Sequence, residues 1–499
     1  MNHVLSNNIL LQLEGFVAQN LGLSFPKDIW ASLERNIISA AKEFGFDDTE
    51  RFVKHIISTP LTRENSEILA SYLTINETYF WRESESFEAL EKKIFPELIK
   101  KRKREEKRIR IWSAGCSTGE EPYSIAIALR RLIPDIDQWN ITILASDINP
   151  KILQKAIIGE YGQWSFRSAP QWLKEKYFIP KEKGKFEIIP EIKSMVTFEY
   201  LNLAEDIFPS SLNNTNAMDI IFCRNVLMYF TQNRATQTLR GLYNSLIQGG
   251  YLVVSASELS LQNYAEFATV NFPGVVFYRK ISKKIEHQQQ QELTVIGEEY
   301  KPIIFELPLK HFEIEEKTKP QISEIENENL HKTEIPINVD SLYEEALSLY
   351  SQGSYTDVIS KLQKNNLAVD EQILLIRAYA NQGKLGDALK SCEKAIAKNK
   401  VDPRLHYLYA TILQENSQLN EAIAALKRAI FLDSDFVLSY FSLGNIYRQQ
   451  GNMRNTKKCY ENVLSIINKR SHDDILLEFE GLNIGRLKEI INASLQVSI

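Results

Sequence analysis

A turn of small residues followed by two acidic residues is the part of this sequence best suited to hold a ligand. The apolar run 109–112 leads into residues 115–119 (Gly-Cys-Ser-Thr-Gly), after which Glu120 and Glu121 open a stretch with helical spacing. Glycine lets the backbone approach a ligand closely, and strand–turn–helix units form nucleotide-type pockets in doubly wound sheets. A phosphate loop instead presents bare N–H groups and a lysine to its anion. The acidic pair therefore favours a cationic, hydroxyl-rich ligand such as S-adenosylmethionine (SAM), which carries a sulfonium and an ammonium group.

Three further polar residues stand at the ends of predicted strands, where ligands bind in open parallel sheets. Asp147 lies roughly 20–30 residues beyond the glycine turn and can accept hydrogen bonds from both hydroxyls of a ribose, although it could equally cap the next helix. Asn202 and Asn225 follow the runs 196–201 and 219–223. An amide both donates and accepts, which suits an adenine edge or an amino-acid group. Each asparagine could instead cap a turn.

An arginine among aromatic residues is the candidate for holding an anionic substrate. Arg82 lies in the segment 76–83 (Asn-Glu-Thr-Tyr-Phe-Trp-Arg-Glu), and its alternative role is a surface ion pair with a nearby glutamate. Tyr229 follows the run 219–223 by several residues, and its alternative role is that of an interior tyrosine whose hydroxyl binds backbone. The basic run 100–110 could touch nucleic acid, but the chain as a whole is acidic, which favours a solvated helix end.

Residues 109–280 alternate strand-like and helical patterns, which is typical of a doubly wound α/β sheet. The predicted strands are 110–113, 141–146, 196–201, 219–223, 251–255 and 275–279, and the predicted helices are 122–132, 151–156 and 232–246. We expect Gly249-Gly250 to end the last helix before its strand. Three short β-prone runs, 177–179, 186–188 and 195–197, predict a small antiparallel insertion over 176–198.

The chain divides into further parts on either side of this sheet. Helical spacing of apolar residues predicts a helical subdomain over 1–90, before the sheet domain at 91–280. Residues 281–339 hold a glutamine run and a polar, acidic stretch with little apolar content. Such a composition predicts a flexible linker.

The last part of the chain, residues 340–499, is helical and repetitive. Gly383-Lys-Leu-Gly-Asp-Ala388 recurs at 417–422 and 451–456, with a spacing of 34 residues. This period is the signature of tetratricopeptide repeats, which stack helical hairpins into an α-solenoid. Such solenoids present an extended concave surface, so we expect a protein partner for this domain.

Bulk composition excludes several classes of protein. The 499 residues exceed a single hydrophobic core, and the net charge of -5 does not favour nucleic acid. Cys116, Cys223, Cys392 and Cys459 are scattered without a CxxC pair, which argues for a reducing compartment and against a structural metal. No apolar run reaches the ~20 residues of a membrane span, and the first residues lack the features of a signal peptide. We therefore expect a cytoplasmic protein without metal and without direct membrane insertion.

Together these motifs resemble the chemotaxis-receptor glutamate methyltransferase family over residues 10–280. The matching stretches are Asn76-x-Thr78-x-x-x-Arg82-Glu83, 112–124, Ala145-Ser-Asp147-Ile, Leu201-Asn202-Leu203 and Ile221-Phe-Cys-Arg-Asn225-Val226-x-x-Tyr229-Phe230. The resemblance implies methyl transfer from SAM to glutamate side chains on the cytoplasmic signalling helices of chemoreceptors. It implies that the contacts to SAM are Asn76, Thr78, Arg82, Glu121, Asp147, Asn202, Leu203, Asn225 and Val226. The insertion resembles the family's β-subdomain, and its short turn leaves open whether it holds a receptor tether.

The reaction implied by this resemblance needs no general base. A glutamate carboxylate is ionised at neutral pH, so catalysis rests on alignment and electrostatics. We expect Arg82 to align the carboxylate and Tyr229 to hydrogen-bond its second oxygen or to close the methyl pocket. Two alternatives stay open: a methyltransferase acting on another substrate, such as a nucleic acid or a small molecule, and a SAM-binding tetratricopeptide scaffold without catalysis. Asn225 is not followed by the Pro-Pro-aromatic run of amino-methylating enzymes, which disfavours a base substrate.

Overall fold

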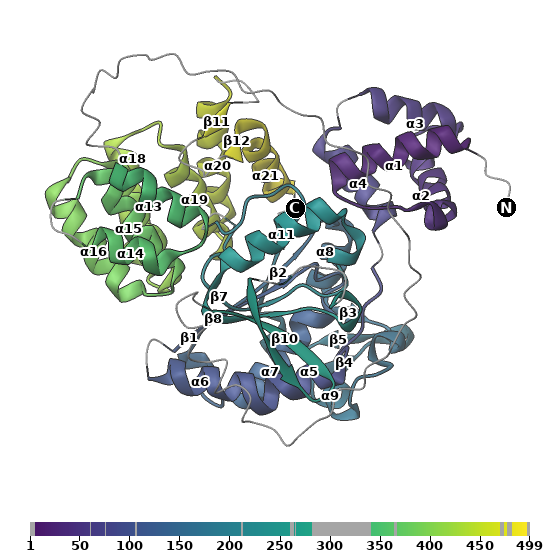
Figure 1. Cartoon of the computed structure of the whole chain (residues 1–499), viewed down its shortest axis with the longest axis horizontal. Helices are drawn as coiled ribbons and strands as arrows, with labels where there is room; N and C mark the ends of the chain where they lie inside the picture. The colour runs from purple at the N-terminus through teal and green to yellow at the C-terminus, as the bar shows by residue number, and fades with distance from the viewer. Residues whose placement is uncertain are drawn as a thin grey trace, which may run out of the picture. The chain divides into compact units, whose positions relative to one another are not determined.

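A seven-stranded sheet with the order β6-β2-β1-β7-β8-β10-β9 organises the first half of the chain in the computed structural model (Figure 1). Neighbours are parallel from β6 to β8, whereas β10 runs antiparallel to β8 and to β9. The chain builds outward from β1 to β6 and then returns to β7 on the other side of β1, so the strand order reverses between β1 and β7. Such a reversal opens a crevice at the carboxyl ends of the strands. The strands are β1 Arg108–Ala114, β2 Asn140–Asp147, β6 Val196–Tyr200, β7 Met218–Phe222, β8 Leu246–Val253, β9 Phe267–Phe272 and β10 Val275–Lys280.

The sheet confirms the predicted α/β class, and each predicted strand overlaps an observed one. The structure describes residues 5–59, 61–74, 76–104, 107–210, 213–259, 264, 266–281, 341–363, 367–469, 474–476 and 482–496. Residues 1–281 and 346–499 belong to one structural unit. The predicted linker, 281–339, lies outside the described residues except for its first position.

The prediction for Gly249-Gly250 was wrong. These glycines do not end a helix, because α11 (Gln232–Ser245) passes directly into β8 and both glycines lie inside that strand. The pairing of β7 with β8 is irregular at this point. Gly249 has a φ of +83°, a backbone conformation that costs glycine little. The glycine pair therefore marks an irregular strand rather than a helix end.

The small antiparallel sheet is confirmed, but one of its strands was predicted at the wrong place. Its order is β3-β5-β4, with β3 Glu160–Tyr161, β4 Phe178–Pro180 and β5 Phe186–Ile188. The run 195–197 instead leads into β6, which pairs in parallel with β2 of the main sheet. A strand as short as β3 leaves no alternating pattern in the sequence, so periodicity could not reveal it.

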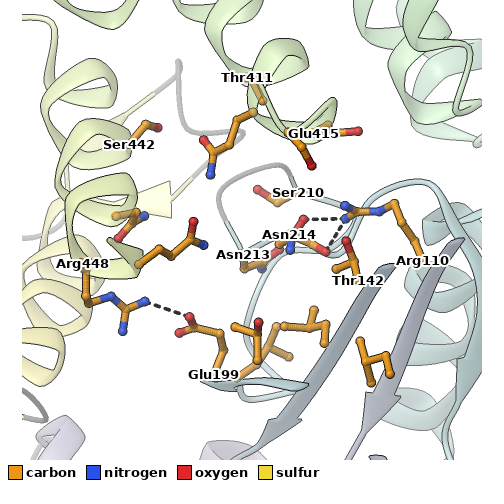
Figure 2. A pocket seen from close by; sticks show the side chains of 18 of the residues that line it. Arg110, Thr142, Glu199, Ser210, Asn213, Asn214, Thr411, Glu415, Ser442 and Arg448 are labelled. Carbon is orange, nitrogen blue, oxygen red and sulfur yellow. Dashed lines mark hydrogen bonds and ion pairs between the residues drawn. The ribbon is translucent and has the colours of Figure 1, made fainter. Parts of the chain in front are cut away.

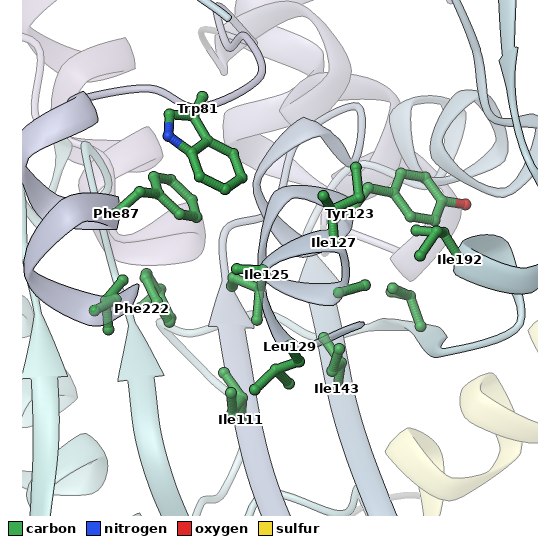
Figure 3. Close-up of a cluster of buried hydrophobic side chains, with 14 of the residues drawn as sticks. Trp81, Phe87, Ile111, Tyr123, Ile125, Ile127, Leu129, Ile143, Ile192 and Phe222 are labelled. Atoms are coloured by element: carbon green, nitrogen blue, oxygen red, sulfur yellow. The ribbon is translucent and has the colours of Figure 1, made fainter. Parts of the chain in front are cut away.

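Helices cover both faces of the main sheet, which explains why its central strands β1 and β7 are buried along their whole length. The helices beside the sheet are α5 Ser84–Ala89, α6 Phe95–Lys103, α7 Glu120–Leu132, α8 Pro150–Ile158, α9 Gln171–Tyr177 and α11. Figure 3 shows Ile125 and Leu129 of α7 among Ile111, Ile143 and Phe222, which belong to three neighbouring strands. These side chains are fully or almost fully buried. The packing fixes α7, and with it the turn that precedes it, against the ends of β1 and β7.

Four helices before the sheet form a separate hydrophobic core. They are α1 Asn7–Leu21, α2 Trp30–Glu43, α3 Thr49–Ser58 and α4 Arg63–Leu73. Leu10, Leu33 and Phe52 are completely buried in this core. The loop after α1 reaches the sheet domain, because Leu23 forms a β-bridge with Phe230. The helical subdomain is thereby placed beside the loop that follows β7.

The C-terminal helices form paired hairpins with the predicted period. They are α13 Ser341–Ser351, α14 Tyr355–Leu362, α15 Val369–Asn381, α16 Leu385–Lys398, α17 Pro403–Glu415, α18 Leu419–Leu432, α19 Val437–Gln449, α20 Met453–Ile467 and α21 Ile484–Gln496. Ala388 and Ala422 are fully buried at equivalent places in successive hairpins. At Gly444 a side chain would overlap the ring of Tyr460. Small residues therefore set the close approach of the paired helices.

The described residues include neither a candidate membrane span nor a candidate metal site. No described helix is both long enough and apolar enough to cross a membrane. Within the same residues, no group of three or more histidine, cysteine, aspartate or glutamate side chains is arranged to hold a metal ion.

Candidate functional site: a cavity where the strand order reverses

A cavity of about 190 Å³ lies at the carboxyl ends of the strands, beside the reversal between β1 and β7. Among the predicted site residues, those that line it are Asn76, Asp147, Asn202, Leu203, Asn225, Val226 and Tyr229. The lining also includes residues of the N-terminal helices and the loops that follow them: Leu21, Leu23, Ser24, Phe25, Ile29, Ser32, Asn36, Leu73 and Thr74. Sequence analysis missed this second wall, because an amphipathic pattern shows which face of a helix is buried but not what it packs against.

The glycine turn forms the floor of the cavity by close backbone packing. Gly115 has a φ of +80°, and a Cβ at this position would overlap the Val226 side chain. Ser117 has a φ of +50°, which is unusual for a residue with a side chain. Its backbone N–H points across the turn and donates to Asp147 Oδ2 at 2.9 Å. Strained backbone of this kind persists only where the surroundings hold it in place, and it clusters at functional sites.

Asp147 offers a preorganised carboxylate to the cavity. Besides the bond from Ser117, its Oδ1 accepts the backbone N–H of Asn149 at 3.0 Å. Burial raises the pKa of this carboxyl group, and the two N–H donors oppose the shift. Asn149 takes the role of helix cap, because its Oδ1 accepts the Ile152 N–H at 3.2 Å at the start of α8. The Asp147 oxygens keep lone pairs for a ligand, which suits a pair of ribose hydroxyls.

The second acceptor in the cavity is Asn225. It has a φ of +57° directly after β7, and among the described residues its buried Oδ1 has no hydrogen-bond partner. A buried acceptor without a donor is costly, so a ligand N–H or O–H is its natural complement. No lysine or arginine is among the described residues that line the cavity, and Asp147 is the one carboxylate there. This set of groups fits a cationic ligand with hydroxyl groups, as SAM is, and does not fit a phosphate.

A buried glutamate that sequence analysis missed holds the loop that carries Asn225. The carboxylate of Glu258 accepts the backbone N–H groups of Asn225 at 2.8 Å, Val226 at 2.9 Å and Met228 at 3.3 Å. It also accepts the Ser255 hydroxyl at 2.6 Å, and Glu258 is completely buried. The Ser-x-x-Glu spacing at 255–258 was a sequence signal, although it indicates a helix cap rather than a brace for another loop.

Glu121 does not line the cavity and instead belongs to a buried ion network. Its carboxylate accepts the Ser113 hydroxyl at 2.7 Å and Arg224 Nη1 at 3.2 Å. Arg224 Nη2 lies 3.0 Å from Glu83 Oε2 and donates to the backbone oxygen of Arg82 at 2.8 Å. Burial raises the pKa of Glu121, and the charge of Arg224 opposes the shift. Arg224 was also missed, although an arginine directly after an apolar strand signals a buried charge that needs partners.

The neighbouring Glu120 points elsewhere. Its carboxylate accepts the hydroxyls of Thr118 at 2.5 Å and Ser165 at 3.0 Å. Burial raises its pKa, and these hydrogen bonds oppose the shift. Glu120 therefore ties the glycine turn to the segment after β3 and is not directed at the cavity.

Arg82 and Thr78 lie outside the cavity lining. Arg82 Nη1 donates to the backbone oxygen of Glu77 at 3.1 Å, and its guanidinium is 5.6 Å from the ring of Tyr79. Thr78 contributes its backbone oxygen to a hydrogen bond from Arg167. Arg82 lies near enough to Tyr229 for its charge to act on that phenol: burial raises the pKa of Tyr229 and the arginine opposes the shift. The structure thus places a surface cation beside the tyrosine of the cavity wall.

Comparison with known proteins agrees with this architecture. Residues 76–276 match the family model described as "CheR methyltransferase, SAM binding domain", and residues 410–451 and 437–470 match tetratricopeptide repeat models. The chain is 33% identical over 261 residues to a chemotaxis protein methyltransferase of Borreliella burgdorferi, covering 52% of this chain and 90% of the relative. It is 33% identical over 258 residues to a chemotaxis protein methyltransferase of Listeria innocua, covering 51% of this chain and 92% of the relative.

A third relative, chemotaxis protein methyltransferase 2 of Vibrio cholerae, is 37% identical over 195 residues, which cover 39% of this chain and 66% of the relative. The matched SAM-binding domain contains the glycine turn, Asp147 and Asn225. The chain therefore belongs to the chemotaxis protein methyltransferase family, as a SAM-dependent methyltransferase domain followed by tetratricopeptide repeats.

Proposed function

We propose that this protein methylates glutamate side chains on the cytoplasmic signalling helices of chemoreceptors and so forms glutamate methyl esters. The observation that carries the proposal is the cavity itself, which is lined by Asp147 and by Asn225, whose Oδ1 has no hydrogen-bond partner within the described part of the chain. The names of the relatives point to the same chemistry in chemotaxis. We also propose that the protein is cytoplasmic. Its proposed domains are the helical subdomain at 1–90, the methyltransferase domain at 91–280, the linker at 281–339 and the repeats at 340–499.

The chemistry asks little of the protein beyond alignment. Bound SAM supplies a methyl group on a sulfonium; a carboxylate oxygen displaces the thioether, the C–S bond breaks with its electron pair on sulfur, and no proton moves. In this proposal Asp147 holds the ribose hydroxyls, while Asn76, Asn202, Leu203, Asn225 and Val226 line the remainder of the donor site. A site that excludes water and fixes its dipoles strengthens each of these interactions.

The proposed acceptor side carries two arginines, of which Arg167 is paired with Glu77 at 2.6 Å. Arg82 and Arg167 both lie against Tyr79, with their guanidinium carbons 5.6 and 4.0 Å from the ring centre. Trp164, which Arg167 also contacts, is 69% exposed. Two cations and an exposed aromatic ring beside the cavity suit an acidic helix. Within this rim, Arg82 is proposed to align the incoming carboxylate, because its charge reaches Tyr229 of the cavity wall.

The backbone of Arg82 is itself fixed by the buried network. Arg224 binds the Arg82 carbonyl while it pairs with Glu83 and Glu121. In this proposal Glu121 and Arg224 act as positioning residues: they set where the loop that carries Arg82 stands relative to the glycine turn. Tyr229 hydrogen-bonds the second carboxylate oxygen or closes the methyl pocket.

The test is methyl transfer to receptors. Purified protein is incubated with methyl-labelled SAM and membranes that carry chemoreceptors from the same cell, and label that is released by base is measured on receptor glutamates. Arg82→Ala is expected to lower the rate by ~10²–10³, the usual loss for one positioned donor, while SAM binding measured by calorimetry is largely kept. Arg240→Ala, which changes an exposed arginine of α11, serves as the matched control.

Two results would contradict the proposal. Near-native turnover of Arg82→Ala would remove the assigned role of that arginine. SAM binding without base-labile label on any receptor would favour the alternative of a SAM-binding scaffold, in which the repeats act and the cavity only senses the cofactor.

A further inference from the structure

Four successive helical hairpins of the repeats touch the methyltransferase domain with the same part of their structure, the end of the first helix and the turn behind it. In the first hairpin, Ser351 O accepts Asn244 Nδ2 at 3.4 Å, and the Tyr355 hydroxyl donates to Asn244 O at 3.4 Å. In the second, a Cβ at Gly383 would lie 3.1 Å from Arg108 Nη1. The third and fourth hairpins contribute Glu415 and Arg448. We call Ser351–Tyr355, Gly383, Glu415 and Arg448 the docking row.

Glu415 makes the most contacts in this row. Its carboxylate accepts Arg108 Nη2 at 3.2 Å and Asn216 Nδ2 at 2.7 Å, and its backbone oxygen accepts Asn140 Nδ2 at 2.7 Å. The Arg108 and Glu415 side chains are 2% and 7% exposed, so the ion pair is withdrawn from water. Arg108 begins β1 and Asn140 begins β2. The contact therefore lies at the amino ends of the strands whose carboxyl ends form the cofactor cavity.

The ion pair makes the contact specific. Arg108 Nε and Nη1 have no hydrogen-bond partner among the described residues, so within that part of the chain Glu415 is the compensating charge. Removing one partner of a buried pair leaves an uncompensated charge, which is strongly unfavourable. Glu415 also acts on Arg110: burial lowers the pKa of that guanidinium to about 10, and the Glu415 charge opposes the shift. Glu415 thus pairs with Arg108 and shares with Asp219 the compensation of Arg110.

The contact mixes polar and apolar groups and is incompletely filled, which is typical of separable interfaces rather than of a single core. A cavity of about 380 Å³ remains between the repeats and the edge of the sheet. Figure 2 shows its polar lining, with Arg110 bound to Asn214 on one side and Arg448 directed at Glu199 on the other. The Arg448–Glu199 pair, at 2.8 Å, closes the far end of the row.

We propose that the docking row is an interaction surface whose occupant is the chain's own methyltransferase domain, with Glu415 as its central contact. The docked repeats leave the cofactor cavity open, because none of the described residues that line it belongs to the repeats. Glu415 holds the amino ends of β1 and β2, whereas Arg448 meets Glu199 near the carboxyl end of β6. An external protein that uses the same ends of the first helices has to displace the methyltransferase domain. The proposal does not depend on which substrate is methylated.

Hydrogen exchange on the intact chain tests this docking. Glu415→Lys places like charges at Arg108 and should release the whole row, so exchange should rise by about tenfold or more at 349–355, 381–385 and 447–451, far along the chain from the substitution. Glu421→Lys is the matched control, since Glu421 is an exposed residue of α18. SAM affinity should be the same in both variants.

Two glycine variants give a second, independent reading. Gly353 and Gly451 have φ values of +71° and +70°, so an alanine strains the backbone equally at both. A Cβ at Gly353 would overlap Asn244, whereas nothing lies within 4 Å of one at Gly451. Gly353→Ala is expected to speed exchange along the row as Glu415→Lys does, and Gly451→Ala is not.

Several results would overturn the proposal. Faster exchange confined to the residues around 415, with the other three turns unchanged, would show that the row does not act as one surface. Equal effects of Glu415→Lys and Glu421→Lys, or of the two glycine variants, would show that contact with the methyltransferase domain is not what protects these turns.

Discussion

Asp147→Asn separates the ligand-binding role of this side chain from its role in the fold. The carboxylate accepts two backbone N–H groups, at 2.9 and 3.0 Å, and it is buried at the cavity wall. An asparagine keeps the shape and one carbonyl oxygen but turns an NH₂ group toward a backbone donor or toward the ligand. The change therefore removes one accepted hydrogen bond and the negative charge.

The expected magnitudes differ for binding and for stability. A hydrogen bond to a charged group contributes about 1.5–3 kcal/mol, so SAM affinity should fall about 10- to 100-fold. Stability of the ligand-free protein should change by about 1 kcal/mol or less, because losing a hydrogen bond is offset by removing a buried charge. Asp137→Asn, which changes an exposed aspartate before the other end of β2, is the control and should alter neither quantity.

The pH dependence follows from the raised pKa of Asp147, which burial causes. The pKa of Asp147 is higher in the folded than in the unfolded protein, so the protonated side chain stabilises the ligand-free fold. This contribution is fully present below the unfolded pKa and is lost as pH rises through the folded pKa. SAM binding has the opposite sign, since the hydroxyls require the ionised form. SAM affinity should therefore fall on acidification at a higher pH than an ordinary aspartate would give, and this fall should be absent in Asp147→Asn.

Calorimetric titration with SAM and thermal unfolding measure the two quantities on the same samples. The reasoning is refuted if Asp147→Asn binds SAM within twofold of the parent chain, or if the acid-induced loss of affinity persists in the variant. A large loss of stability would show instead that Asp147 is chiefly a brace for the turn.

Three further predictions concern the residues that hold the cavity together. Arg224→Met leaves Glu83 and Glu121 without their shared cation and should destabilise the fold by about 3–5 kcal/mol, measured by urea unfolding; a loss below about 1 kcal/mol would contradict the assigned network. Glu258→Gln weakens the hydrogen bonds that hold the loop after β7 and should lower the free energy of unfolding by about 1–3 kcal/mol. It should also lower SAM affinity, so unchanged affinity would show that the loop is held by other contacts. Gly115→Ala should lower both stability and SAM binding, because the added Cβ would overlap Val226. The loss should be at least the ~1–2 kcal/mol that a left-handed backbone costs a residue with a side chain. A variant with native melting temperature and affinity would mean that the turn relaxes freely.

The sequence predicted what is encoded locally. The strands at 110–113 and 141–146 are rich in apolar residues because helices cover both sheet faces, and such runs are recognisable without a structure. The repeats were predictable because a period of 34 residues survives in the sequence. The strand at 160–161 was not, since two residues carry no periodicity, and Gly249-Gly250 was misassigned because glycine is compatible with a helix end and with a strand irregularity alike.

The site was predictable where a residue directly follows a strand, as Asp147 and Asn225 do. It was not where the function of a residue depends on a partner far along the chain. Arg224 meets Glu121 across 103 residues, and Glu258 meets Val226 across 32. The wall that the N-terminal helices contribute to the cavity depends on how the helical core packs against the sheet core. The hydrophobic pattern within either core does not specify this packing. The roles of Thr78, Arg82 and Glu121 as contacts to SAM stay predictions.

The cofactor cavity is lined by residues of two separate hydrophobic cores, and this has a thermodynamic consequence. Leu21 and Phe25 belong to the N-terminal helical core, whereas Val226 and Leu203 belong to a core on the sheet, and all four line the cavity. A ligand that binds only when both walls are in place stabilises their association, by about 2.7 kcal/mol when its concentration is 100 times its dissociation constant. SAM bound in this cavity then stabilises the association of two hydrophobic cores, in addition to donating its methyl group. When SAM is scarce, the association of the helical subdomain with the sheet loses this contribution.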